Sequence, residues 1–233
     1  MDVVVMVLGE YGFQSGEGRS RSKLDLPGLQ QELLEKVAAV NPNIILVLMN
    51  GRPLVLNWAS ENLPAIVEAW HLGSQSGNAI AQVLYGDYNP SGKLPMSFPR
   101  SVGQMPLYYN YKSTGRPGVD GEDSGSVFWS HYGDEKNSPL YAFGHGLSYT
   151  TFEYSEVRLN TTEMTKKSSI KASVTVTNIG KVHGKEVVQL YLQDPYASAV
   201  RPVKELKGFE MIELLPGASK EVTFTISEEL LKF

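Results

Sequence analysis

The sequence contains no cysteine, and this absence excludes disulfide bridges, thiolate metal sites and cysteine nucleophiles. It also lacks any apolar run near the ~20 residues that a bilayer-spanning helix needs, so we expect no membrane segment. Neither sign of charge dominates, because the formal net charge is -4 over 233 residues, and we expect no nucleic-acid partner. The first apolar run has no basic segment before it, so no signal peptide is visible.

The composition is that of an ordinary globular protein, with 42% hydrophobic and 20% charged residues. A chain of this length is expected to form one large domain or two modest ones. Met1 leads directly into a strand pattern, so we expect the natural polypeptide to extend further upstream. The apolar end at Leu230–Phe233 suggests that the second domain is incomplete.

Residues 1–107 alternate between strand and helix patterns. The strands are continuous apolar runs, which are typical of a parallel sheet covered on both faces. This segment is therefore predicted to be an α/β layered sandwich domain with a mostly parallel sheet. The expected strands are Val3–Leu8, Ile44–Met49 and Ala65–Trp70, and the expected helices are Leu29–Val40, a short one from about Trp58, and Asn78–Leu84.

Residues 149–233 change to a period of two, with turn residues between short strands. Ala172, Val174 and Val176 alternate with polar residues, as in a strand with one buried face. We therefore predict an all-β, immunoglobulin-like sandwich. The expected strands are Thr151–Asn160, Ser169–Asn178, Val187–Gln193, Leu206–Leu214 and Lys220–Ile226. Residues 108–148 form an aromatic and glycine-rich connecting segment, whose end at Leu140–Tyr149 should be packed.

The loop after the first strand, Gly9–Arg21, holds the candidate functional residues. It carries two carboxylates, Glu10 and Glu17, and two arginines, Arg19 and Arg21. Loops at the carboxyl ends of parallel strands are where ligands bind in open α/β sheets. A carboxylate on such a loop can be a general acid. The alternative is a solvated glutamate that pairs with one of the arginines.

Several separate motifs together carry a resemblance to the C-terminal half of family 3 glycoside hydrolases, the β-glucosidases and their relatives. They are Ser15–Arg21 followed by Leu24–Pro27, Asn50–Pro53, Gly86–Pro95 followed by Phe98 and Pro99, Phe143–Tyr149, and Lys207–Phe209. The resemblance covers essentially the whole chain, and it looks strongest to bacterial, periplasmic-type β-glucosidases.

The resemblance implies a retaining hydrolase of terminal, non-reducing β-linked sugars that needs no cofactor. It implies an aspartate nucleophile on an N-terminal (β/α)8 barrel, an acid/base glutamate on the following α/β domain, and a fibronectin-type-III-like domain at the end. The barrel is missing from this chain, so the chain alone is expected to be inactive. Its substrate would be a β-glucoside or oligosaccharide.

The acid/base position of the family corresponds to Glu17, in the setting Ser-Gly-Glu-Gly, and Glu10 is the rival candidate. Arg21 matches the family's arginine, and Arg21 and Arg19 are expected to bind substrate or to anchor the loop. The family often has Asp where this chain has Ser20. The turn Asn50–Pro53 is interpreted as a strand-to-helix turn, with direct sugar contact as the alternative.

Other functions remain open at this point. The family also contains β-xylosidases, and the sandwich could serve as a non-catalytic carbohydrate-binding or adhesion module. A flavodoxin-like nucleotide site fits poorly, because Glu10 and Glu17 would repel phosphate. The four histidines are scattered without zinc spacing, so no metal site is expected. A periplasmic or secreted location follows from the resemblance alone.

Overall fold

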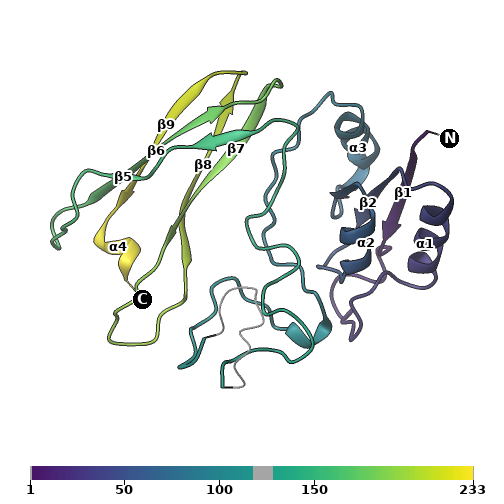
Figure 1. The fold of residues 1–233 in the computed structure, drawn as a ribbon, viewed down its shortest axis with the longest axis horizontal. Helices are drawn as coiled ribbons and strands as arrows, with labels where there is room; N and C mark the ends of the chain where they lie inside the picture. The colour runs from purple at the N-terminus through teal and green to yellow at the C-terminus, as the bar shows by residue number, and fades with distance from the viewer. Residues whose placement is uncertain (1, 118–127, 233) are drawn as a thin grey trace. The chain divides into compact units, whose positions relative to one another are not determined.

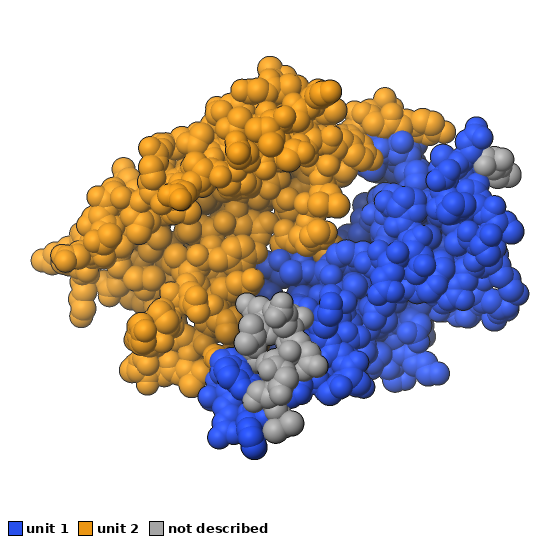
Figure 2. All heavy atoms as spheres, viewed as in Figure 1, with its two compact units in different colours: residues 1–84, 95–109, 114–143 blue, residues 85–94, 110–113, 144–233 orange. Residues whose placement is uncertain are grey.

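The computed structural model describes residues 2–117 and 128–232. The chain divides into two compact units whose segments alternate along the sequence (Figure 2). Unit 1 comprises residues 1–84, 95–109 and 114–143, and unit 2 comprises residues 85–94, 110–113 and 144–233. Unit 1 thus takes in most of the expected connecting segment, and the domain boundaries expected after residues 107 and 148 stay predictions.

A three-stranded parallel sheet forms the centre of unit 1, in the order β1-β2-β3 (Figure 1). Its strands are β1 (Val4–Gly9), β2 (Ile44–Met49) and β3 (Ala65–Glu68). Val7 pairs with Val47, and Val47 pairs with Val67, so the three apolar runs lie in register. The continuous apolar strands therefore form the parallel sheet that their pattern predicts.

The helices of unit 1 follow the strands, as expected for an α/β domain. They are α1 (Gln30–Val40), α2 (Asn57–Asn62) and α3 (Ser76–Leu84), with short 3-10 turns η1 (Gly73–Gln75) and η2 (Val102–Gln104). In Figure 1, α1 lies beside β1, whereas α3 lies on the other side of the sheet. The core residues with no exposed surface are Leu34 of α1, four residues of β2 and the following Leu54. Those of β2 are Ile44, Leu46, Val47 and Leu48.

The expectation that both faces of the sheet are covered is wrong at β1. Val5 is 46% exposed and Val7 is 54% exposed, on the face opposite to the buried Met6. Within the described residues, β1 pairs on one side only, with β2, and stands at the edge of the sheet. The expected apolar stripe of α1 is also only partly buried, because Leu34 is inside while Leu33 is 50% exposed.

Unit 2 is an antiparallel β structure (Figure 1). Its elements are β4 (Phe152–Tyr154), β5 (Arg158–Leu159), β6 (Ile170–Asn178), β7 (Gly184–Leu192), β8 (Glu205–Leu214), β9 (Ser219–Ile226) and the short helix α4 (Glu228–Leu231). Strand β6 pairs with β4, β5 and β9, whereas β7 pairs with β8. The single strand expected at 151–160 is therefore two short strands that both pair with β6.

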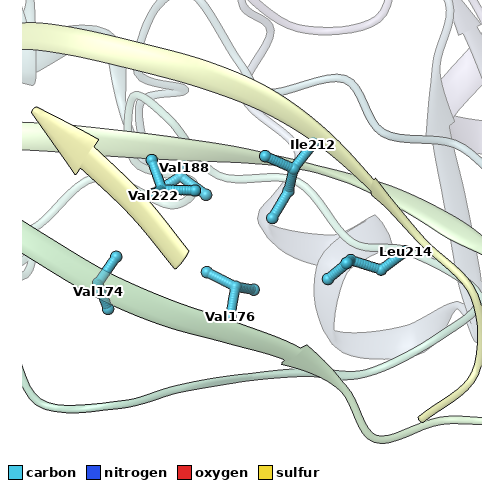
Figure 3. Packing of buried hydrophobic residues seen from close by; sticks show 6 residues of the cluster. All are labelled: Val174, Val176, Val188, Ile212, Leu214 and Val222. Atoms are coloured by element: carbon cyan, nitrogen blue, oxygen red, sulfur yellow. The ribbon is translucent and has the colours of Figure 1, made fainter. Parts of the chain in front are cut away.

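A compact apolar core joins the two sheets of unit 2 (Figure 3). It consists of Val174 and Val176 from β6, Val188 from β7, Ile212 and Leu214 from β8, and Val222 from β9. Ser173, Thr175 and Thr177 of β6 lie on the opposite face, where Ser173 and Thr223 share a hydrogen bond of 2.7 Å across the strands. The predicted half-buried alternation is confirmed, and the two sheets form the expected sandwich.

Residues 86–94 of the first of two motifs, Gly86–Pro95, pack within unit 2 against residues 144–149 of the second, Phe143–Tyr149. The Leu94 N–H donates to the carbonyl of His145 at 2.8 Å. The Lys93 ammonium donates to the carbonyl of Gly146 at 2.9 Å and lies 3.2 Å from the Glu186 carboxylate. A Cβ on Gly146 would lie 2.1 Å from the Gly92 carbonyl oxygen, so only glycine fits there. The aromatic end of the connecting segment is thus packed, as predicted.

Candidate active site

The three parallel strands of unit 1 all end in polar residues at one edge of the sheet. Glu10 follows β1, Asn50 follows β2, and Glu68 is the last residue of β3. The register pairs Gly9 with Met49 and Leu48 with Glu68, so the three ends are neighbours. This is the edge at which open α/β sheets bind ligands.

Glu10 is buried at this edge and is held by two arginines. Its side chain has no exposed surface. Arg21 Nη1 lies 2.7 Å from its Oε1, and Arg52 Nε lies 3.0 Å from the same oxygen. The Gly51 N–H donates to its Oε2 at 3.3 Å. A buried carboxylate requires such partners, because an unpaired charge in the interior is strongly unfavourable.

The Arg52 guanidinium holds the loop by binding two of its backbone carbonyls. Its Nη2 donates to the carbonyl of Gln14 at 2.6 Å and to the carbonyl of Arg19 at 2.8 Å. Arg21 closes the other end of the loop, where its Nη2 donates to the carbonyl of Asp25 at 2.9 Å. The two guanidinium groups therefore join Glu10 to both ends of the loop that follows β1.

Glu17 lies at the exposed tip of this loop, between two glycines. Gly16 has φ of 116° and Gly18 has φ of 68°, conformations that favour glycine. No atom lies within 4 Å of a Cβ at either position, so the chain here arches away from the rest of unit 1. Within the described residues, the Glu17 carboxylate has no hydrogen bond or salt bridge, and Arg21 is already engaged by Glu10.

Gly51 is needed for a close approach rather than for backbone freedom. A Cβ at this position would lie 1.8 Å from Ser15 Oγ and 3.3 Å from His71 Nε2. Its φ is not among the positive ones, so an unusual backbone conformation is not the reason for the glycine. Ser15 thus packs the loop against the turn after β2. Pro53 does not begin a helix, because α2 starts at Asn57.

Two residues of the turn Asn50–Pro53 hold the loop, a role that the sequence did not predict. Arg52 looked like part of an ordinary turn, yet its side chain binds Glu10 and two loop carbonyls. Asn50 is fully buried and donates through Nδ2 to the Arg52 carbonyl at 2.7 Å, which fixes the turn that carries Arg52. A polar residue directly after a buried strand was the one available signal for both.

Two aromatic residues flank the start of the loop and remain exposed. Tyr11 is 62% exposed and Phe13 is 72% exposed, and their rings meet edge to face at 6.1 Å between centroids. Within residues 2–117 and 128–232, no three His, Asp or Glu side chains come close enough to hold a metal ion. The same residues contain no helix with the length and apolar character to cross a bilayer.

Comparison with known proteins connects both units to one enzyme family. Residues 1–149 match the Glycosyl hydrolase family 3 C-terminal domain, and residues 186–233 match the Fibronectin type III-like domain. The Periplasmic beta-glucosidase of Salmonella typhimurium is 52% identical over 100% of this chain, which spans 30% of that protein. A Beta-xylosidase of Formosa agariphila is 46% identical over 97% of the chain, and 30% of its length is matched.

A solved structure is similar over nearly the whole chain. The β-glucosidase from Listeria innocua in complex with glucose gives a TM-score of 0.94 at 44% identity, covering 99% of this chain and 32% of that one. The expected fold class, an α/β domain followed by a fibronectin-III-like sandwich, is confirmed. The chain spans about 30% of the length of the relatives that it matches. It belongs to glycosyl hydrolase family 3.

Proposed function

We propose that this chain is the acid/base-bearing part of a retaining β-glucosidase. In the first step the aspartate of the missing barrel attacks the anomeric carbon while Glu17 protonates the departing glycosidic oxygen. In the second step the Glu17 carboxylate takes a proton from water, whose oxygen displaces the aspartate. The single observation that carries this role is that Glu17 is exposed at the tip of an anchored loop.

The surroundings of the two glutamates favour Glu17 over Glu10. A general acid must reach the oxygen that it protonates. Glu10 is buried and both of its oxygens are occupied by Arg21, Arg52 and the Gly51 N–H. Glu17 faces solvent and its carboxylate is engaged by no other described residue. In this proposal Glu10 anchors the loop, and Glu17 does the chemistry.

The two arginines named from the sequence have different proposed roles. Arg21 anchors the loop through its contacts with Glu10 and the Asp25 carbonyl. Arg19 is exposed two residues after Glu17, and its backbone carbonyl is bound by Arg52. The fixed backbone and exposed side chain of Arg19 suit a contact with substrate hydroxyl groups.

The proposed substrate is a terminal β-glucoside. This choice rests on relatives named as β-glucosidases, including one whose solved structure contains glucose. A β-xylosidase is the alternative, because relatives in Formosa agariphila carry that name. The proposed location is the periplasm, after the name of the Salmonella typhimurium relative.

We expect the chain by itself to be inactive. Retention of configuration requires two carboxyl groups about 5–5.5 Å apart on opposite sides of the scissile bond. The chain supplies one of them, and the nucleophile belongs to the barrel that the family carries elsewhere. Substantial β-glucoside hydrolysis by the isolated chain would contradict this division.

The test is a chimera in which this chain replaces the segment that it matches in the Salmonella typhimurium protein. Glu17→Gln should lower kcat for unactivated β-glucosides about 10²–10⁴-fold, the usual contribution of general acid catalysis. The exposed Glu61 of α2 offers a matched control, and Glu61→Gln should leave kcat unchanged. Full activity in Glu17→Gln would contradict the proposal. A larger loss of kcat in a folded Glu10→Gln variant than in Glu17→Gln would favour Glu10 as the acid/base.

A further inference from the structure

Two buried oxygen acceptors at the neighbouring ends of β2 and β3 lack a donor. Among the described residues, neither Oε2 of Glu68 nor Oδ1 of Asn50 receives a hydrogen bond. The two side chains are close enough for Asn50 to lower the pKa of Glu68, but neither of these two oxygens receives a hydrogen bond from the other residue. Buried polar atoms are almost always paired, because losing water without a replacement partner costs about 1–3 kcal/mol.

One proton would satisfy both atoms. If Glu68 is neutral, its Oε2–H donates to Asn50 Oδ1, while its Oε1 still accepts the Trp70 N–H at 2.9 Å. Asn50 keeps its own donation to the Arg52 carbonyl at 2.7 Å. An ionised Glu68 would leave both oxygens without a donor.

Glu68 has no charged partner among the described residues. The charged or titratable groups at the neighbouring strand ends are Glu10 after β1, Arg21 and Arg52 that bind Glu10, and His71 after β3. None of these forms a hydrogen bond or ion pair with Glu68 in the described part of the chain. Burial raises the pKa of Glu68 to about 7 and outweighs the contacts with the Trp70 N–H and with Asn50, which lower it.

The backbone beside Glu68 is also unusual. Trp70 has φ of 47°, a left-handed conformation that is strained for a bulky residue. The hydrogen bond from its N–H to Glu68 supports that conformation, and its ring packs on Phe98 at 5.8 Å between centroids. Strain of this kind persists where the surrounding contacts fix it, often at functional sites.

We propose that Glu68 is a positioning residue that carries a proton in mildly acidic solution and holds the loop of Glu17 through Asn50 and Arg52. The proposed contact joins the Glu68 Oε2–H to Asn50 Oδ1. The observed contacts continue from Asn50 Nδ2 to the Arg52 carbonyl and from the Arg52 guanidinium to the loop carbonyls. Loss of the proton would weaken the first contact and loosen the loop. The functional consequence rests on the function proposed above for Glu17, but the protonation and the anchoring do not.

The proton can be observed directly in the full chain by infrared difference spectroscopy. At pH 6 the wild type should show the C=O stretching band of a protonated carboxylic acid, and Glu68→Gln should lack that band. The band should fade by pH 8, because with a pKa of about 7 the neutral fraction falls about tenfold over this range. Glu61→Gln is the matched control and should retain the band.

The anchoring is tested by hydrogen exchange of the loop amides from residue 10 to residue 21. After correction for intrinsic rates, wild-type protection should fall as pH rises from 6 to 8. In Glu68→Gln it should stay constant, because the amide is neutral at both values and can still donate to Asn50. A merely structural glutamate would not give this difference in pH dependence.

Two results would overturn the proposal. One is the absence of the acid band from the wild type at pH 6, which remains decisive even if Glu68→Gln does not fold. The other is the same pH-dependent loop exchange in Glu68→Gln as in the wild type. Neither measurement uses a glycoside, so both results would be the same if Glu17 had no catalytic role. A failure of the function proposed for Glu17 can therefore be distinguished from a failure of the proposal for Glu68.

Discussion

The Arg52 guanidinium lies 3.0 Å from the buried Glu10 carboxylate and joins the turn after β2 to the loop after β1. The same guanidinium binds the carbonyls of Gln14 and Arg19, on either side of the exposed Glu17. The loop is thus fixed at its base and free at its tip. That arrangement suits a side chain that must reach a partner on another domain.

Removal of Arg52 should destabilise the chain. Arg52→Ala leaves the buried Glu10 with Arg21 as its remaining cationic partner. Breaking a buried ion pair costs about 3–5 kcal/mol, and with Arg21 retained we expect about 2–4 kcal/mol in urea unfolding.

The control for Arg52→Ala is Lys36→Ala, which removes an exposed pair with Glu32 on α1. Exposed pairs contribute about 0–1 kcal/mol, so this variant should be nearly neutral. Equal effects of the two substitutions on the free energy of unfolding would show that Glu10 does not depend on Arg52.

A methyl group at Gly51 should push the loop away from the turn. In Gly51→Ala the new Cβ would lie 1.8 Å from Ser15 Oγ and 2.7 Å from Ser15 Cβ. Overpacking of this kind costs about 1–3 kcal/mol, and Ser15→Gly in the same chain should restore most of it. Urea unfolding of the single and double variants measures the recovery.

Gly77 of α3 provides the comparison for Gly51, since nothing lies within 4 Å of a Cβ there. Gly77→Ala should be stabilising by about 0.5–1 kcal/mol, because alanine favours the helix. If Ser15→Gly gave no recovery in Gly51→Ala, the close contact between loop and turn would be refuted.

The stability of the chain should depend on pH through Glu68. Its pKa is raised from 4.5 to about 7, so the folded state holds this proton more tightly than the unfolded state does. Stability from this group is therefore complete below about pH 4.5 and declines as pH rises through about 7. Relative to Glu68→Gln, the wild type should lose up to about 3 kcal/mol across that window.

Unfolding by urea at several pH values measures this difference. Glu61→Gln serves as the control because Glu61 is an exposed glutamate on α2. Parallel pH curves for the wild type and Glu68→Gln would mean that Glu68 is charged in the folded state.

The sandwich of unit 2 should depend on its small apolar core. Ile212 of β8 is 2% exposed within that core (Figure 3). The adjacent Met211 is 58% exposed. Ile212→Ala should cost about 2–5 kcal/mol in the free energy of unfolding. Met211→Ala, on the outer face of the same strand, should cost much less. A larger cost for Met211→Ala than for Ile212→Ala would mean that the opposite face of β8 is buried.

The sequence predicted those features that depend on local pattern. Ile44–Met49 is a strand with the expected bounds, because six apolar residues between turns can hardly form anything else in an α/β chain. The alternation around Val174 likewise predicted which face of β6 is buried. By contrast, the exposed face of β1 was not visible, because Val5 and Val7 have the same composition as buried strand residues.

The site was predicted less completely than the fold. Both glutamates were identified from their place after β1, but the burial of Glu10 depends on Gly51 and Arg52, more than 40 residues away, as well as on Arg21. Arg52 lies 42 positions from Glu10 in sequence, and no local pattern indicates that their side chains meet. Glu68 was hidden because a glutamate ending an apolar strand usually faces water.

The most direct test of the account is the anomeric product that Glu17→Ala forms from an activated aryl β-glucoside in the presence of azide, using the chimera. Without its general base the glucosyl-enzyme should accumulate, and azide should attack it from the face opposite the aspartate. The account predicts restored turnover with β-glucosyl azide as the product. No rescue, or an α-glucosyl azide, would contradict the assignment of Glu17 as the acid/base.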